Sequence, residues 1–260
     1  MRASTRSSRF RHQKGLSDQQ LVLAWQSTSL LLGYPDEELL ARSGLLREAA
    51  AKLPPSVSDP LLAFLSHLEK TPIPELAADF VATFDHQKRC CLYLTYFQHG
   101  DTRNRGVALL RFKTAYRQAG MVLCDEELPD HLGVLLEFGA TADVAVARDL
   151  LLEHRAGLEL LRLALEDAHS PWAHVLAAVS ATLPPLAGDD REAVMKLAAA
   201  GPPAEEVGLA PFAPPEFLSG PGDGGSGGGG GSGGKVSLPI PTFTPAGARD
   251  SKGAQNGARP

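Results

Sequence analysis

The stretch SDQQLVLAWQSTSLLLGYP, residues 17–35, carries the signals of one complete helix. Ser17 and Gln20 match the S-x-x-Q pattern of a capping box, which satisfies backbone N–H groups at a helix start. Gly33 and Pro35 end the helix, because glycine suits the left-handed turn there and proline cannot continue a helix. Between these signals, side chains recur at helical spacing and mark one stripe: Leu21, Ala24, Trp25, Thr28, Leu31 and Leu32. The stretch therefore predicts a helix that packs by one face.

Similar start and stop signals repeat along the chain. Asp36 caps a helix expected to reach Lys52, and Asp59-Pro60 opens one that ends near Lys70. Pro74-Glu75 opens the next. Further helices are expected at about residues 102–118, 129–140, 142–168 (one or two), 171–181 and 189–199.

No convincing run of alternating strands appears, although CCLYLTYFQHGD (residues 90–101) is strand-like in composition. We therefore predict an all-α fold, a single helical-bundle domain of about nine or ten helices. Apolar residues make up 43% of the chain, which is enough for a packed core, and no apolar run reaches the roughly 18 residues of a membrane span.

The two ends differ in composition from the middle. Residues 1–15 are rich in arginine and serine, which predicts a disordered basic N-terminus, although organellar transit peptides share this composition. Residues 16–200 are expected to form the helical domain, and residues 201–219 a Pro-rich extension. Residues 220–260 begin with GPGDGGSGGGGGSGG, so we predict a Gly/Ser linker and a disordered tail.

Charge is unevenly distributed. The net charge of -5 combines +5 in residues 1–15, +2 in residues 220–260 and -12 in residues 16–219. An acidic middle argues against nucleic-acid binding. Within it, residues 88–117 carry +6, which indicates either a solvated helix face or a site for a phosphate-bearing or acidic partner.

Motifs of the common enzyme classes are missing from the sequence: there is no P-loop, G-x-S-x-G elbow or H-E-x-x-H. Cys90 and Cys91 are adjacent, so they lack the C-x-x-C spacing of zinc and redox sites and are expected to be buried free thiols. His86, His99 and His131 are irregularly spaced, so no metal site is expected. A metal- or nucleotide-dependent helical enzyme that uses these three histidines remains the alternative hypothesis.

Three ordered blocks of sequence resemble one family. FDHQKRCCLYLTYFQHGDTRNRGVALLRFKTAYRQAG at residues 84–120 is similar to the signature of the respiratory nitrate reductase assembly chaperones, also called molybdenum cofactor assembly chaperones or delta subunits. ELPDHLGVLLEF (127–138) and LLGYPDEEL (31–39) match two further blocks of these redox-enzyme maturation chaperones. The resemblance covers about residues 20–185. One departure is Gly133, where the family often has proline.

The resemblance implies an all-helical, non-enzymatic cytoplasmic chaperone. Such a protein binds the apo catalytic (alpha) subunit of nitrate reductase through that subunit's N-terminal peptide. It binds no cofactor permanently and is not stably inserted in the membrane. It holds its partner while molybdenum–bis-guanine-dinucleotide is inserted, and proteins of cofactor biosynthesis are further candidate partners.

A helix-in-groove partner needs an apolar trough with charges at its rim. We expect Tyr93, Leu94, Tyr96, Phe97, Leu135 and Phe138 to line the trough, and Glu127, Asp130, Glu137 and Asp143 to face a basic peptide. His131 is expected at the same rim, with its protonated form favoured by nearby carboxylates. We assign a separate duty to Arg103 and Arg105, contact with the cofactor or its delivery protein.

Overall fold

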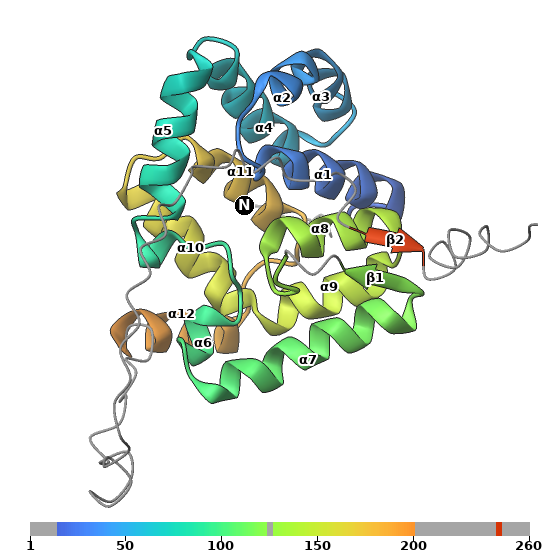
Figure 1. The fold of residues 1–260 in the computed structure, drawn as a ribbon, viewed down its shortest axis with the longest axis vertical. Coiled ribbons are helices and arrows are strands. Elements are labelled where there is room, and N and C mark those ends of the chain that lie inside the picture. Colours follow the sequence, from blue (N-terminus) through green and yellow to red (C-terminus); the bar gives the residue numbers. More distant parts are fainter. Residues whose placement is uncertain (1–14, 124–126, 201–242, 246–260) are drawn as a thin grey trace, which may run out of the picture.

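The computed structural model describes residues 15–123, 127–200 and 243–245, and these residues form an all-α domain with twelve α-helices (Figure 1). The helices are α1 (Asp18–Leu31), α2 (Glu37–Ala41), α3 (Ser43–Ala50), α4 (Pro55–Leu68), α5 (Ile73–Phe84), α6 (Tyr96–His99), α7 (Arg103–Gln118), α8 (Leu132–Thr141), α9 (Val144–Glu153), α10 (Arg155–Asp167), α11 (Trp172–Ala181) and α12 (Gly188–Ala200). A 3₁₀ turn, η1 (Lys88–Cys90), and two three-residue strands, β1 (Met121–Leu123) and β2 (Phe243–Pro245), complete the described elements.

The predicted capping box at the start of α1 is confirmed. The Ser17 side chain accepts from the Gln20 N–H, and the Gln20 side chain accepts from the Ser17 N–H. The α1 helix lies beside α8 and α11, and α11 also packs on α4. Two fully buried tryptophans tie these helices together. The indole N–H of Trp25 donates to Thr182 Oγ1 at 3.0 Å, and that of Trp172 donates to the Leu31 carbonyl at 3.2 Å.

The helix count exceeds the predicted nine or ten because one expected helix is broken in two and because α6 forms a short helix within residues 90–101. The helix expected from Asp36 to Lys52 divides at Arg42 into α2 and α3, next to Ser43-Gly44, a pair that commonly accompanies helix kinks. The α4 helix begins at Pro55 rather than at Asp59-Pro60, so Pro60 lies inside the helix. Pro55 takes the first helical position, where a missing N–H costs little.

A small β-ladder was not predicted. Gly120, with φ +74°, ends α7 in the left-handed region and turns the chain into β1. The β1 strand pairs antiparallel with β2, in the register Met121–Pro245, Val122–Thr244 and Leu123–Phe243. The predicted disordered tail at residues 220–260 therefore includes three residues that form a strand. Its other residues, and residues 1–14 and 201–219, lie outside the described part of the chain.

In the residues that the structure describes, no helix combines the length and apolar composition needed to cross a membrane.

Candidate functional site

The two longest motif blocks meet at one backbone contact. Residues Tyr93 and His131 form an isolated antiparallel bridge. Around it, the Leu94 N–H donates to the Asp130 carbonyl at 3.1 Å, and the Leu132 N–H donates to the Leu92 carbonyl at 2.8 Å. Residues 90–101, which are strand-like in composition, therefore form only one β-bridge, at Tyr93 between η1 and α6. This contact brings together side chains that lie 35 residues apart in the sequence.

Asp130 is fully buried beneath the bridge. Its Oδ2 accepts from the Thr95 N–H at 3.2 Å and from the Thr95 hydroxyl at 2.5 Å. The guanidinium of Arg105 approaches the same oxygen, with 3.6 Å between Nη2 and Oδ2. Arg105 Nε also donates to Thr95 Oγ1 at 3.3 Å. Thr95 therefore links the Asp130 carboxylate to the Arg105 guanidinium. The sequence did not predict this role, although Thr95 lies inside the motif at residues 84–120.

Arg105 covers this buried carboxylate and faces solvent on its other side. Its Nη1 donates to the exposed Asp101 carboxylate at 3.0 Å, one helical turn away. Its guanidinium carbon lies 5.3 Å from the centre of the Tyr93 ring, a cation–π distance. The Arg105 side chain is only 16% exposed, so these contacts hold it largely within the domain.

Two polar atoms in this cluster have no hydrogen-bond partner among the described residues. They are Asp130 Oδ1 and Arg105 Nη2, and both atoms are buried. Buried polar groups nearly always have a partner in the protein, in water or in a ligand.

His131 lies at the edge of the same cluster. Its ring packs edge-on against Tyr93, with the ring centres 5.5 Å apart. Burial lowers the pKa of His131 from 6.5 to about 4 and outweighs Asp130, which acts to raise it. The expectation of a protonated His131 is therefore wrong, because the cost of burying a cation exceeds the gain from one carboxylate. At neutral pH the ring is uncharged.

Neighbouring groups are held neutral too. Burial is the main cause of the raised pKa of Tyr93, and Glu127 and Asp130 add to it. Burial also raises the pKa of Tyr96, and it raises that of the Cys91 thiol to about 11. Cys91 is therefore not a thiolate nucleophile at neutral pH. We call the surface formed by Cys91, Tyr93, Tyr96, Asp101, Arg105, Glu127 and His131 the Tyr93 patch.

Several residues that we expected in an apolar trough lie in the core. Phe138 is fully buried against Tyr116, with ring centres 4.5 Å apart, and Leu94, Leu135 and Phe97 are buried as well. They therefore cannot line an open trough in this structure. Asp130 is likewise too deep to stand at an acidic rim. The burial of these side chains depends on contacts between distant segments, so it could not be predicted from either motif (residues 84–120 or 127–138) alone.

The remaining predicted residues have local positions. Glu137 is half-buried on α8, and Asp143 caps α9 by accepting from the Val146 N–H at 2.9 Å. Arg103 is exposed at the first position of α7. Because Arg105 pairs with Asp130, the separation we expected between a basic and an acidic surface fails for these two residues.

A groove between α7 and α9 offers the apolar lining that the predicted trough lacks. It has a volume of about 420 Å³ and is lined by Leu110, Arg111, Thr114, Ala115, Gln118, Val146, Asp149 and Leu150. Leu110 is 56% exposed, and Val107, one turn earlier on α7, is 69% exposed. Arg111 forms an ion pair of 2.6 Å with Glu153 on α9. Arg105 and Leu110 are five residues apart on one helix, so the patch and the groove lie about 8 Å apart along its axis.

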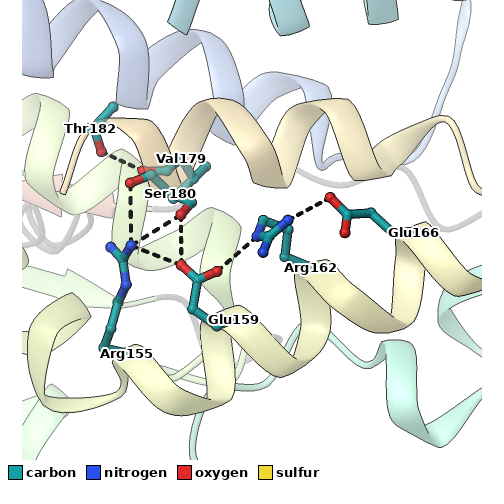
Figure 2. Close-up of polar contacts among 7 residues, drawn as sticks. All are labelled: Arg155, Glu159, Arg162, Glu166, Val179, Ser180 and Thr182. Carbon is teal, nitrogen blue, oxygen red and sulfur yellow. Dashed lines mark hydrogen bonds and ion pairs between the residues drawn. The ribbon is translucent and has the colours of Figure 1, made fainter. Parts of the chain in front are cut away.

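A second buried polar cluster connects α10 to α11 (Figure 2). Glu159, with its side chain 2% exposed, accepts from Arg155 at 2.8 Å, from Arg162 at 2.7 Å and from the Ser180 hydroxyl at 2.6 Å. Arg162 continues the series to Glu166 near the surface. The spacing of these charges along α10 follows helical turns. The cluster therefore fixes how α10 and α11 pack, and it contains no residue of the Tyr93 patch.

The histidines of the alternative hypothesis do not gather. Across residues 15–123, 127–200 and 243–245, no three His, Cys, Asp or Glu side chains are grouped so that they could hold a metal ion. His86 is exposed beyond the end of α5, whereas His131 packs on Tyr93.

The sequence pattern of the family described as nitrate reductase delta subunit matches residues 50–178. The probable nitrate reductase molybdenum cofactor assembly chaperone NarJ of Bacillus subtilis is 33% identical over 165 residues, which cover 62% of this chain and 88% of that protein. The chain belongs to the nitrate reductase delta subunit family. The NarJ chaperone of Escherichia coli K12 is 32% identical over 148 residues, or 56% of this chain and 63% of that protein.

A longer protein is also similar to this chain. The nitrate reductase-like protein NarX of Mycobacterium tuberculosis is 39% identical over 160 residues, which cover 62% of this chain but only 24% of NarX. The chain thus spans about a quarter of the length of that relative. The family match includes the Tyr93 patch and all the residues that line the α7–α9 groove, whereas α12 and β2 lie beyond it.

Proposed function

We propose that this protein is an assembly chaperone for nitrate reductase. In this role it binds the catalytic subunit before the molybdenum cofactor is inserted, acts in the cytoplasm and catalyses no reaction itself. Support comes from its family and from relatives that are named as nitrate reductase molybdenum cofactor assembly chaperones. It binds no cofactor permanently, and it assists the insertion of molybdenum–bis-guanine-dinucleotide into its partner.

The observation that carries the binding site is the pair of partly exposed aromatic side chains, Tyr93 and Tyr96, beside the buried Asp130–Arg105 ion pair. We infer that the N-terminal peptide of the catalytic subunit lies over the Tyr93 patch. Tyr93, Tyr96 and His131 then contact the peptide as neutral, amphipathic surfaces. Glu127 supplies negative charge for a basic peptide, and Glu137 lies further along α8.

The apolar face of the peptide, if it folds as an amphipathic helix, fits the groove between α7 and α9. Leu110, Val146 and Leu150 offer apolar surface there, and Arg111 and Asp149 provide charges of both signs at its edges. This arrangement meets the requirement of helix-in-groove recognition, an apolar trough with polar edges. The patch and the groove are close enough along α7 for a helix of a few turns to reach both.

The exposed cations of α7 have a second proposed duty. Arg103, Lys113 and Arg117 are exposed on this helix. Guanidinium and ammonium groups bind phosphate oxygens well, so this face suits the phosphates of the cofactor or an acidic surface of its delivery protein. Arg105 is better assigned to holding Asp130 than to this duty.

Titration of the catalytic subunit's N-terminal peptide by calorimetry tests the proposal. Glu127→Lys should weaken binding about 10-fold, equivalent to ~1.4 kcal/mol, because it reverses a charge at the rim. Leu110→Asp should weaken binding at least as much, because it places a carboxylate in the groove. The matched control is Glu48→Lys, on the exposed face of α3, an element with no patch or groove residue. Equal affinities for all four proteins would refute the site, and no peptide binding by wild type would refute the function.

A further inference from the structure

The edge of β1 is a feature that the proposed function does not use. Met121 and Leu123 pack on the core with their side chains, so β1 is fixed to the domain. The strand directly follows α7, and Leu123 is four residues before Glu127 of the Tyr93 patch. Four residues span at most about 14 Å, so β1 ends close to that patch.

The partner of β1 is distant in the chain. β2 consists of residues 243–245, which lie beyond the Gly/Ser-rich run of residues 220–234 and outside the family match. Among the described residues, β1 and β2 make up the whole sheet. Without β2, backbone groups on this edge of β1 would lack a strand partner, and such an edge is a template for another extended chain.

The register indicates how weak the pairing is. Pro245 has no N–H, so the Met121–Pro245 pair cannot be the one that exchanges hydrogen bonds. The alternation of an antiparallel ladder then assigns the reciprocal bonds to Val122 and Thr244. Each such bond contributes only about 0.5–1.5 kcal/mol, so the pairing is weak and another strand can replace it.

We propose that the β1 edge is a strand-addition site, which the chain's own residues 243–245 occupy until an extended segment of the client protein replaces them. This inference rests on the proposed chaperone function and adds a regulatory element to it. Strand addition recognises backbone rather than side chains, so the tail and a client segment can compete without sharing a sequence. The tail would then weaken client binding and promote release, which suits a chaperone that must let its client go.

The test uses the full chain with Thr244→Pro, which removes the N–H that would donate to the Val122 carbonyl. Thr244→Ala is the matched control, because it keeps that N–H. Hydrogen exchange of the Val122 amide should be at least ten-fold faster in Thr244→Pro than in wild type or Thr244→Ala. Equal exchange in all three proteins would show that the tail does not occupy the edge, and the proposal would fall.

A labelled synthetic peptide of residues 240–248 then probes the vacated edge. It should bind Thr244→Pro at least ten-fold tighter than wild type. A peptide of the catalytic subunit's N-terminus that is long enough to continue beyond its helical part should displace it. If the client peptide binds wild type but does not displace the labelled peptide, the proposal that a client segment replaces β2 is wrong. If the client peptide binds none of the proteins, the proposed function fails, and the tail peptide still decides whether the edge accepts a strand. A dimer in wild type that Thr244→Pro converts to monomer would assign the strand to a second copy.

Discussion

Asp130 and His131 are adjacent residues in different surroundings. Asp130 is buried as a partner of Arg105 and Thr95, whereas His131 is half-buried as a neutral ring. The sequence identified both residues as important through their motif, together with Tyr93 and Arg105. It could not show that Asp130 and Arg105 pair with each other, because that contact depends on how the segment around Tyr93 folds against the start of α8.

Removing the Asp130 carboxylate should destabilise the protein strongly. Asp130→Ala leaves the Arg105 guanidinium, 16% exposed, without its buried partner, and changes of this kind cost roughly 3–5 kcal/mol. Asp101→Ala removes the exposed partner of the same arginine and should cost less than about 1 kcal/mol. Urea unfolding of both variants measures the difference. Similar costs for the two would mean that burial does not set the strength of the pair.

His131 should make stability depend on pH in the acid range. Its pKa is about 4 in the folded state and near 6.5 when unfolded, so the unfolded chain binds the proton more readily. The stability due to the neutral ring is therefore complete above about pH 6.5 and is lost as the pH falls towards 4, to a limit of roughly 3 kcal/mol. His131→Gln should flatten the stability difference between pH 7 and pH 5 relative to wild type. Parallel curves for the two proteins would contradict the assigned pKa.

At the scale of elements, local signals predicted helix starts better than helix breaks. Ser17 and Asp36 cap their helices as expected, because a cap depends on residues within one turn. The break at Arg42 and the start of α4 at Pro55 were missed, although Ser43-Gly44 and Pro55 are local signals for a break and for a first helical position. The β1–β2 pair could not be predicted, because its strands are three residues long and about 120 positions apart.

Two glycines in helices should respond oppositely to alanine. A Cβ on Gly139 of α8 would lie 2.6 Å from the Trp25 ring and 2.7 Å from Ala147, so Gly139→Ala forces a buried tryptophan aside and should cost roughly 1–3 kcal/mol or more. A Cβ on Gly106 of α7 meets nothing within 4 Å, so Gly106→Ala should stabilise by up to ~1 kcal/mol through helix propensity. Thermal unfolding of both variants gives the two signs. Stabilisation by Gly139→Ala would contradict the close packing of α1 on α8.

The polar cluster of α10 and α11 allows a matched comparison of two glutamates (Figure 2). Glu159→Ala removes the buried carboxylate shared by Arg155, Arg162 and Ser180, and it should cost roughly 3–5 kcal/mol. Glu166→Ala removes the 46% exposed end of the same series and should cost less than about 1 kcal/mol. The midpoints of denaturant unfolding measure both costs, provided that the dependence of the unfolding free energy on denaturant concentration is the same for the variants and wild type. A small cost for Glu159→Ala would mean that apolar packing alone holds α10 on α11.

At the scale of the whole molecule, the helical domain should supply nearly all of the stability and the tail very little. The core helices bury both tryptophans and most of the leucines, whereas β2 contributes three residue pairs at one edge. A chain that ends at Ala200 should therefore melt within about 4 °C of the full chain, since 1 kcal/mol shifts the midpoint of a domain of this size by roughly 2–4 °C. The same truncation should speed exchange of the Val122 amide at least ten-fold while leaving core amides such as that of Leu135 unchanged. A much larger fall in the melting temperature would show that residues 201–260 complete the core. The tail would then be part of the fold, and its replacement by a client segment would cost more than a binding peptide can supply.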